Sequence, residues 1–240
     1  MKNKSKKFSK LNKSRKFSKL KEQKGGTLEN YTIQSVVNLW CTDKGAAERK
    51  YGHISQWDTS AVTDMSRLFV NQKIFNDDIS NWDVSNVTNM VLMFSGAFNQ
   101  PIGRWNVKKV TNMEQMFSNA SAFNQPLEQW NVGNVTNMQY MFHSAPRFNQ
   151  PLANWERNNS TVGNVTNMSG MFYDAYAFNQ PLEQWNVGNV TDMNYMFRYA
   201  AAFLQRYPNA DNDPRSVFTS AETNTPNGIE FNNETLREAV

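Results

Sequence analysis

The pattern of apolar and polar positions along this chain repeats six times between residues 57 and 197. Each copy holds a tryptophan, followed within eight to thirteen residues by a methionine. The tryptophans are Trp57, Trp82, Trp105, Trp130, Trp155 and Trp185, and the methionines are Met65, Met90, Met113, Met138, Met168 and Met193. Self-similarity at a period of about 25 residues is typical of solenoids, in which successive copies stack on one another.

The spacing within a copy predicts one short strand and one short helix. In residues 130–135 a tryptophan and two valines alternate, as on a strand that is a few residues long. The following apolar positions are Met138, Met141, Phe142 and Ala145, at i, i+3, i+4 and i+7. This spacing favours a helix of about two turns, with Thr136 as its N-cap. The chain is therefore predicted to be an α/β repeat, with Asn-Gln-Pro turns between copies.

The repeated apolar residues are predicted to form the core of the stack. The predicted core residues are Trp82, Trp105, Trp130, Trp155, Trp185, Met113, Met138, Met168, Phe117, Phe142 and Phe172. The methionines could also suggest copper or redox chemistry, but their recurrence beside phenylalanines favours packing, because a flexible thioether fills gaps between rings. The repeated asparagines Asn99, Asn124, Asn149 and Asn179 are expected to form a hydrogen-bonded ladder between copies.

The sequence divides into five segments. Residues 1–26 form a basic tail, which is expected to be disordered, and residues 27–56 contain a cap helix, from Thr32 to about Glu48, and a lead-in. Residues 57–207 are the six-copy array. Residues 208–230 are polar and rich in turn residues, so we interpret them as a linker. Residues 231–240 match part of the first cap and suggest the start of a second cap helix.

The charge is concentrated at the N-terminus. Residues 1–24 contain eleven Lys or Arg and one acid, a net charge of +10, which leaves −6 for the rest of a chain whose net charge is +4. Such a tail is expected to be a solvated arm; docking to nucleic acid or another anionic surface is the alternative. No apolar signal segment or membrane-spanning stretch is visible, so an intracellular or virus-encoded protein is one expectation.

Catalytic and metal-binding chemistry is not indicated. The chain contains one cysteine, Cys41, and two histidines, His53 and His143, too few for a zinc cluster. The acidic pair Asp77-Asp78 has no base or second convergent acid in its neighbourhood of sequence. We therefore predict no enzymatic activity and no cofactor, and we interpret Cys41 as a core residue.

The polar positions next to the repeated tryptophans and valines are the predicted partner-binding face. They are Asp83, Asn106, Lys108, Asn131, Glu156 and Asn186, with the insertion from Glu156 to Ser160 as an adjoining loop. Aligned outward positions of a repeat array often contact a partner. A solvated surface is the alternative, because these side chains are small and polar, unlike the aromatic and arginine residues that dominate binding energy.

Two sequence blocks resemble a known family. Trp57-Asp58-Thr59-Ser60-Ala61-Val62-Thr63-Asp64-Met65 and Phe123-Asn124-Gln125-Pro126-Leu127 are similar to repeats of the BspA-like leucine-rich-repeat surface proteins. The resemblance covers about residues 32–207. It implies a leucine-rich-repeat-like solenoid without known enzymatic activity, a role in surface display or adhesion, and a protein or glycan partner. It also implies a location at the cell surface.

Overall fold

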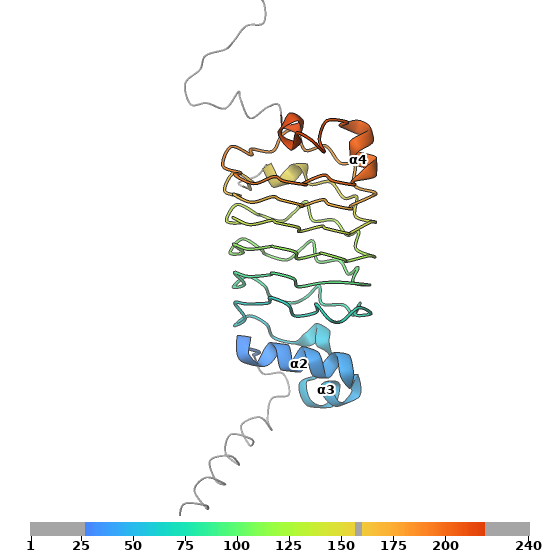
Figure 1. Cartoon of the computed structure of the whole chain (residues 1–240). Coiled ribbons are helices and arrows are strands. Elements are labelled where there is room, and N and C mark those ends of the chain that lie inside the picture. The colour runs from blue at the N-terminus through green and yellow to red at the C-terminus, as the bar shows by residue number, and fades with distance from the viewer. Residues whose placement is uncertain (1–26, 157–159, 219–240) are drawn as a thin grey trace, which may run out of the picture.

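A computed structural model describes residues 27–156 and 160–218 of the chain. Figure 1 shows a stack of flat coils between helices α2 (Asn30–Thr42) and α3 (Lys44–Tyr51) at one end and α4 (Ala201–Arg206) at the other. Three short 3-10 helices complete the structure: η1 (Ile54–Gln56), η2 (Ala153–Glu156) and η3 (Pro214–Val217). The predicted basic tail, part of the insertion and the predicted second cap helix lie outside the described residues.

The prediction of one strand in each coil was wrong. In the described part of the array, extended pairing is limited to single-residue parallel bridges between neighbouring coils. They join Asp64, Asn89, Asn112, Asn137, Asn167 and Asp192 in order. The segment from Trp130 to Val135, which was predicted as a strand, contains a tight turn in which the Val135 N–H donates to the Val132 carbonyl at 2.9 Å. The alternating apolar residues therefore point inward from a turn.

The prediction of a helix after each repeated threonine was also wrong, so the α/β classification fails. Tyr140, two residues after Met138, has a φ of 53°, which no α-helix accommodates, and the equivalent residues of the other coils share this left-handed conformation. The Met138 N–H donates to Asn167 of the next coil at 3.0 Å, whereas the Met141 N–H closes a turn onto the Met138 carbonyl. Consecutive turns of this kind place residues i and i+3 inward, which reproduces the helical spacing.

Backbone and side-chain ladders join the coils. The Thr136 hydroxyl does not cap a helix; it donates to the Thr111 carbonyl of the preceding coil at 3.2 Å. The predicted asparagine ladder is confirmed. Asn124 Oδ1 accepts from the Asn149 N–H at 2.9 Å and from Gln150 Nε2 at 3.0 Å. Each coil thus satisfies polar groups of its neighbour, so single coils depend on stacking.

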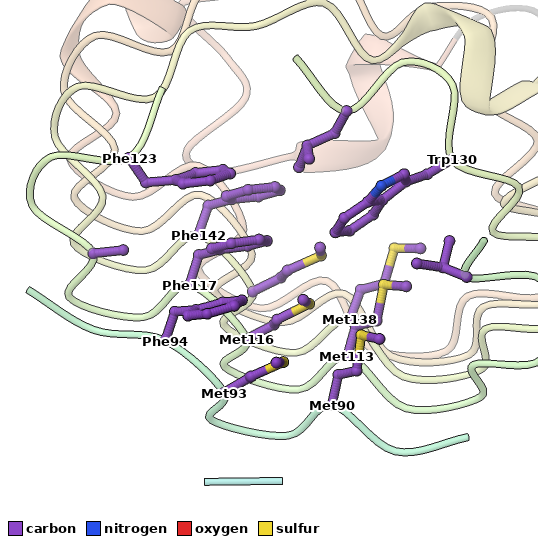
Figure 2. Close-up of a cluster of buried hydrophobic side chains, with 14 of the residues drawn as sticks. Met90, Met93, Phe94, Met113, Met116, Phe117, Phe123, Trp130, Met138 and Phe142 are labelled. Atoms are coloured by element: carbon purple, nitrogen blue, oxygen red, sulfur yellow. The ribbon is translucent and has the colours of Figure 1, made fainter. Parts of the chain in front are cut away.

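The predicted core is confirmed, because every tryptophan, methionine and phenylalanine predicted for it is buried. Figure 2 shows Phe94, Phe117 and Phe142 stacked in one column beside columns of methionines, with Trp130 at the side. The centroids of neighbouring rings in this column lie 5.5 to 5.6 Å apart. Offset stacking at this distance is favourable for aromatic rings.

The N-terminal cap consists of two helices where one was predicted. Asp43 separates α2 from α3, and its carboxylate accepts from the Ala46 N–H at 2.9 Å. From α2, Asn30 Oδ1 accepts from the Thr63 N–H at 2.8 Å and from the Asp64 N–H at 3.1 Å. Cys41 is half-buried against the core, and its burial raises the pKa of its thiol to about 11.

Residues 208–218 belong to a C-terminal cap, although they were predicted to be part of a linker. Ala210, Val217 and Phe218 are buried, and the Phe218 ring lies 6.4 Å from that of Phe197 in the last coil. Phe218 therefore continues the phenylalanine column beyond the last repeat. The cap was not predicted because the segment is rich in turn residues and only three of its side chains make the apolar contact with the array.

Candidate interaction surfaces

Most of the predicted partner-binding face is engaged in the turns of the coils. Asp83, Asn106, Asn131 and Asn186 occupy equivalent positions, and in each the side-chain oxygen accepts from the backbone N–H two residues later, at 2.9 to 3.3 Å. Lys108 is exposed in the same region. These oxygens have a structural task, which is to hold the turn after each tryptophan.

Glu156 lies outside this column. Its carboxylate accepts from the Thr161 hydroxyl at 2.7 Å and from the Val162 N–H at 3.0 Å, so it closes the base of the insertion. Thr161 takes the equivalent turn position, because its hydroxyl accepts from the Gly163 N–H at 2.8 Å. Glu156 is therefore the first of the five extra residues, and Thr161 takes the place in the column that was predicted for Glu156.

A different surface carries the large exposed side chains. We name it the aromatic row; it consists of Tyr140, His143, Tyr173, Tyr176, Tyr195, Arg198 and Tyr199. Tyr176, Tyr195 and Tyr199 are 50 to 54% exposed, and they are three of the five large hydrophobic side chains that are exposed among the described residues. Such exposure of aromatic residues beside an arginine is typical of binding surfaces.

Ring contacts link the aromatic row across coils four, five and six. The His143 ring centroid lies 5.5 Å from that of Tyr140 and 5.3 Å from that of Tyr173. The Tyr173 ring meets the Tyr199 ring edge-on at 5.4 Å. The Arg198 guanidinium lies 5.1 Å from the Tyr199 ring centroid and 5.2 Å from that of Tyr195. Side chains held in this way lose little further entropy when they bind a partner.

The tight turns of the Met-x-x-Met-Phe segments position the aromatic row. Tyr140 and Tyr195 occupy the left-handed position two residues after the first methionine of their coils, and Tyr199 occupies a second left-handed position four residues later. In coil five, Gly170 replaces the tyrosine. A Cβ atom there would lie 2.0 Å from Cε1 of Tyr140, so the glycine makes room for the Tyr140 ring.

The sequence analysis missed this surface because it treated the segment as a helix. The available signal was a difference between copies. The turn positions hold Arg67, Leu92 and Gln115 in the first three coils, but tyrosine or glycine in the last three. A comparison of the variable positions from copy to copy would have located the aromatic residues in the C-terminal half.

Charged neighbours act on the aromatic row. The Asp174 charge and its hydrogen bond to Tyr176 raise the pKa of that phenol. A hydrogen bond with Tyr199 raises the pKa of Arg198 above its ordinary value. Burial lowers the pKa of His143, and the Asp174 charge opposes this shift. The row therefore presents aromatic rings and the cation of Arg198, with the Asp174 carboxylate beside them.

Three stretches of the chain, residues 11–97, 38–155 and 158–234, match a family model described as Mycoplasma protein of unknown function, DUF285. The chain belongs to the DUF285 family. No curated protein and no solved structure matches it. The family description gives no activity, so the surfaces of this DUF285 protein have to be interpreted from their own chemistry.

Two further features of the DUF285 protein concern possible ligands. Within residues 27–156 and 160–218, no group of three or more His, Cys, Asp or Glu side chains is placed to hold a metal ion. None of the helices in the same ranges combines the length and apolar character needed to cross a bilayer. Neither observation identifies a ligand, and the aromatic row remains the best-formed candidate surface.

His143 is expected to make the stability of this DUF285 protein depend on pH. Its imidazole lies between two tyrosine rings, with Nδ1 at 3.1 Å from the Ser118 hydroxyl. Because burial lowers its pKa, the unfolded chain takes up this proton at a higher pH than the folded chain. The free energy of unfolding should therefore decrease as the pH falls below about 6.5, the ordinary value for histidine.

Urea titrations above and below that pH measure this effect. His143→Gln should reduce the loss of stability between the two conditions, whereas His53→Gln, which changes an exposed histidine, should retain it. An unchanged loss in His143→Gln would show that other groups cause the pH dependence. Carboxylates such as Asp77 and Glu183, whose pKa values are lowered, act only at more acidic pH.

Proposed function

We propose that this protein is a non-catalytic repeat scaffold that binds a protein partner through the aromatic row. The proposal agrees with the resemblance to BspA-like leucine-rich-repeat proteins, from which it takes a surface or adhesion role. The observation that carries it is that the Arg198 guanidinium lies over the rings of both Tyr195 and Tyr199 at the surface of the last coil. Tyrosine and arginine are enriched among residues that dominate binding energy.

The predicted polar face supports partner binding less well. Its asparagine oxygens already accept backbone hydrogen bonds, so a partner would have to compete with the turns. The aromatic row offers larger side chains whose rings are not used in the core. The core methionines and tryptophans are buried, so this proposal assigns them packing and no redox role.

Affinity capture with the full chain, followed by quantitative mass spectrometry, tests the proposal. The double variant Tyr195→Ala/Tyr199→Ala should lose a protein captured by the wild type, with affinity reduced at least about tenfold in a direct titration. The matched control Asn106→Ala/Asn186→Ala changes two exposed residues of the predicted polar face and should keep that protein. If only the control variant lost the captured protein, the binding site would be the polar face and not the aromatic row.

The basic N-terminal segment supports a second candidate function, which is docking to nucleic acid or another anionic surface. Residues 1–24 carry a net charge of +10. Binding of this kind should weaken steeply with salt and disappear when the segment is removed. Binding through the aromatic row should instead survive removal of the segment.

Binding to an array of immobilised glycans tests whether the ligand is a glycan. If the wild type binds a glycan on the array and Tyr195→Ala/Tyr199→Ala does not, the partner of the aromatic row is a glycan and not a protein.

A further inference from the structure

Within the residues that the structure describes, the hydrogen-bond ladder that joins the coils ends at coil six. In coil five, the N–H groups of alternate residues donate to the carbonyls of coil six at 2.8 to 2.9 Å. These donors are Met168, Gly170, Phe172 and Asp174. The equivalent residues of coil six are Met193, Tyr195, Phe197 and Tyr199, and none of their N–H groups has an acceptor in the described part of the chain.

One backbone carbonyl at the C-terminal edge also lacks a hydrogen-bond donor among the described residues. The Thr166 carbonyl accepts from the Thr191 N–H at 2.8 Å and from its hydroxyl at 3.0 Å, and the same arrangement joins the earlier coils. The Thr191 carbonyl has no corresponding donor among the described residues. An open edge of this kind is a template for another segment of backbone.

The N-terminal edge of the stack, by comparison, is covered by helix α2. Asn30 of α2 accepts from two backbone N–H groups of coil one, and Gln34 Nε2 donates to the Leu68 carbonyl at 3.2 Å. At the C-terminal end, the cap covers the apolar interior: Phe218 packs near Phe197, and Arg215 donates to the Val190 carbonyl. The backbone donors beside this contact remain open.

A groove runs along the open edge. Residues 191–195 and Arg198 form its wall on the coil, and residues 211–215 form its wall on the cap. Its volume is about 560 Å³, within the range of roughly 300 to 1,000 Å³ that is common for ligand sites. Met193 lines it and, at 7% exposure, is the least enclosed methionine of the core. The groove therefore gives a ligand access to the backbone of coil six.

We propose that this groove binds a peptide segment of another protein, which adds one rung to the ladder. Donors on alternate residues require carbonyls on alternate residues, and a polypeptide backbone supplies them at this spacing. In the preceding coils these donors are met by segments of the Thr-Asn-Met-x-x-Met-Phe type, whose backbone follows the same series of turns. A partner segment of this sequence type is therefore the best match.

A second copy of the folded chain is a poor occupant. Two C-terminal edges brought face to face would set N–H groups against N–H groups. The N-terminal edge of another copy is already occupied by Asn30 and Gln34. The ligand of the groove is thus a peptide segment that is not itself part of a capped stack of coils. The site depends on backbone groups, and of the tyrosine side chains of the aromatic row Tyr195 alone lines the groove.

Amide hydrogen exchange on the full chain provides the first test. In the free protein, the amides of Met193, Tyr195 and Tyr199 should exchange at least about a hundredfold faster than those of Met168, Gly170 and Asp174, which are bonded to coil six. Protection of the coil-six amides equal to that of coil five would overturn the proposal, because it would show that the edge is already covered.

Binding of a labelled peptide with the sequence of residues 134–146 provides the second test, by fluorescence anisotropy. The peptide should bind the full chain and slow exchange at Met193, Tyr195 and Tyr199. Asn212→Trp fills the groove from the cap side and should lower the affinity at least tenfold; Asn209→Trp, at an exposed residue outside the groove, should not. Absence of binding, or equal binding to both variants, would overturn the proposal.

A modified peptide keeps the test decisive if Asn212→Trp does not fold. Replacing alternate backbone amides by esters weakens the carbonyl acceptors and should lower the affinity for the wild-type chain, while a scrambled peptide should not bind. Retained affinity of the ester peptide would contradict a ladder. Tyr199→Ala, at a side chain that does not line the groove, leaves the backbone donors in place, so it should bind the peptide even if it loses a partner of the aromatic row.

Discussion

Replacing Phe142 with alanine is expected to destabilise the protein by about 3 to 5 kcal/mol. The ring is fully buried in a central coil, and its centroid lies 4.0 Å from that of Phe148, 5.5 Å from that of Phe117 and 5.6 Å from that of Phe172. Truncation removes contacts with three rings and leaves a cavity that the neighbouring coils cannot fill, because ladders fix their spacing.

The position of Phe142 adds to this effect. In a repeat array each coil contacts only its neighbours, so a weak central coil separates the two halves of the stack. Urea titration should show a lower midpoint for Phe142→Ala, and exchange protection should decrease in coils on both sides. Tyr199→Ala, which truncates an exposed ring, is the control and should stay within about 0.5 kcal/mol of the wild type. Equal midpoints would mean that the phenylalanine column does not stabilise the stack.

The sequence predicted the repeat, its register and its core because these follow from the period alone. Residues that recur in every copy must occupy equivalent places, and large apolar side chains in equivalent places are buried together. Trp130, Met138 and Phe142 illustrate this, since all three are buried, and the Phe142 ring stacks on the equivalent rings of Phe117 and Phe172. The asparagine ladder was predicted by the same reasoning.

The conformation within a coil could not be predicted from spacing. A helix and a series of tight turns both place residues i and i+3 on one side, so Met138 and Met141 are consistent with either. The difference lies in where the N–H groups bond. The Tyr140 N–H bonds to Ser169 of the next coil at 2.9 Å, a contact that depends on a partner 29 residues away. Inter-coil bonding here outweighs local helix propensity.

The aromatic row was missed for a related reason. Three of its tyrosines, Tyr140, Tyr195 and Tyr199, lie at left-handed positions, where no side chain was expected to be prominent, and the residues at these positions differ between copies. A search for recurring residues emphasises the positions that build the coil. The positions that vary, such as Tyr195 and Gly170, distinguish the last coils from the first and mark the surface that we propose for binding.

Gly96 is the position where adding a single methyl group should have the largest effect. Its φ is 67°, and a Cβ atom would lie 2.2 Å from the Lys73 carbonyl oxygen and 2.7 Å from the Lys73 carbonyl carbon. That oxygen accepts from the Ala97 N–H at 2.8 Å, and the Gly96 N–H donates to the Asn119 carbonyl at 2.9 Å. The backbone therefore cannot move away without breaking ladder bonds on both sides.

Gly96→Ala should consequently lower the free energy of unfolding by about 2 to 5 kcal/mol, the sum of a left-handed backbone penalty of ~1 to 2 and an overpacking cost of ~1 to 3. Asn119→Ala is the matched control, because Asn119 occupies the same left-handed position in the next coil, with a φ of 60°. It should cost about 1 to 2 kcal/mol, since it changes the backbone preference and removes the hydrogen bond from Asn119 Nδ2 to the Ser118 hydroxyl at 3.1 Å, without overpacking. If urea titration gave equal losses for both variants, the close approach of Lys73 would contribute nothing. A larger loss at Gly96 would show that the close approach of the Lys73 backbone requires a glycine at this position.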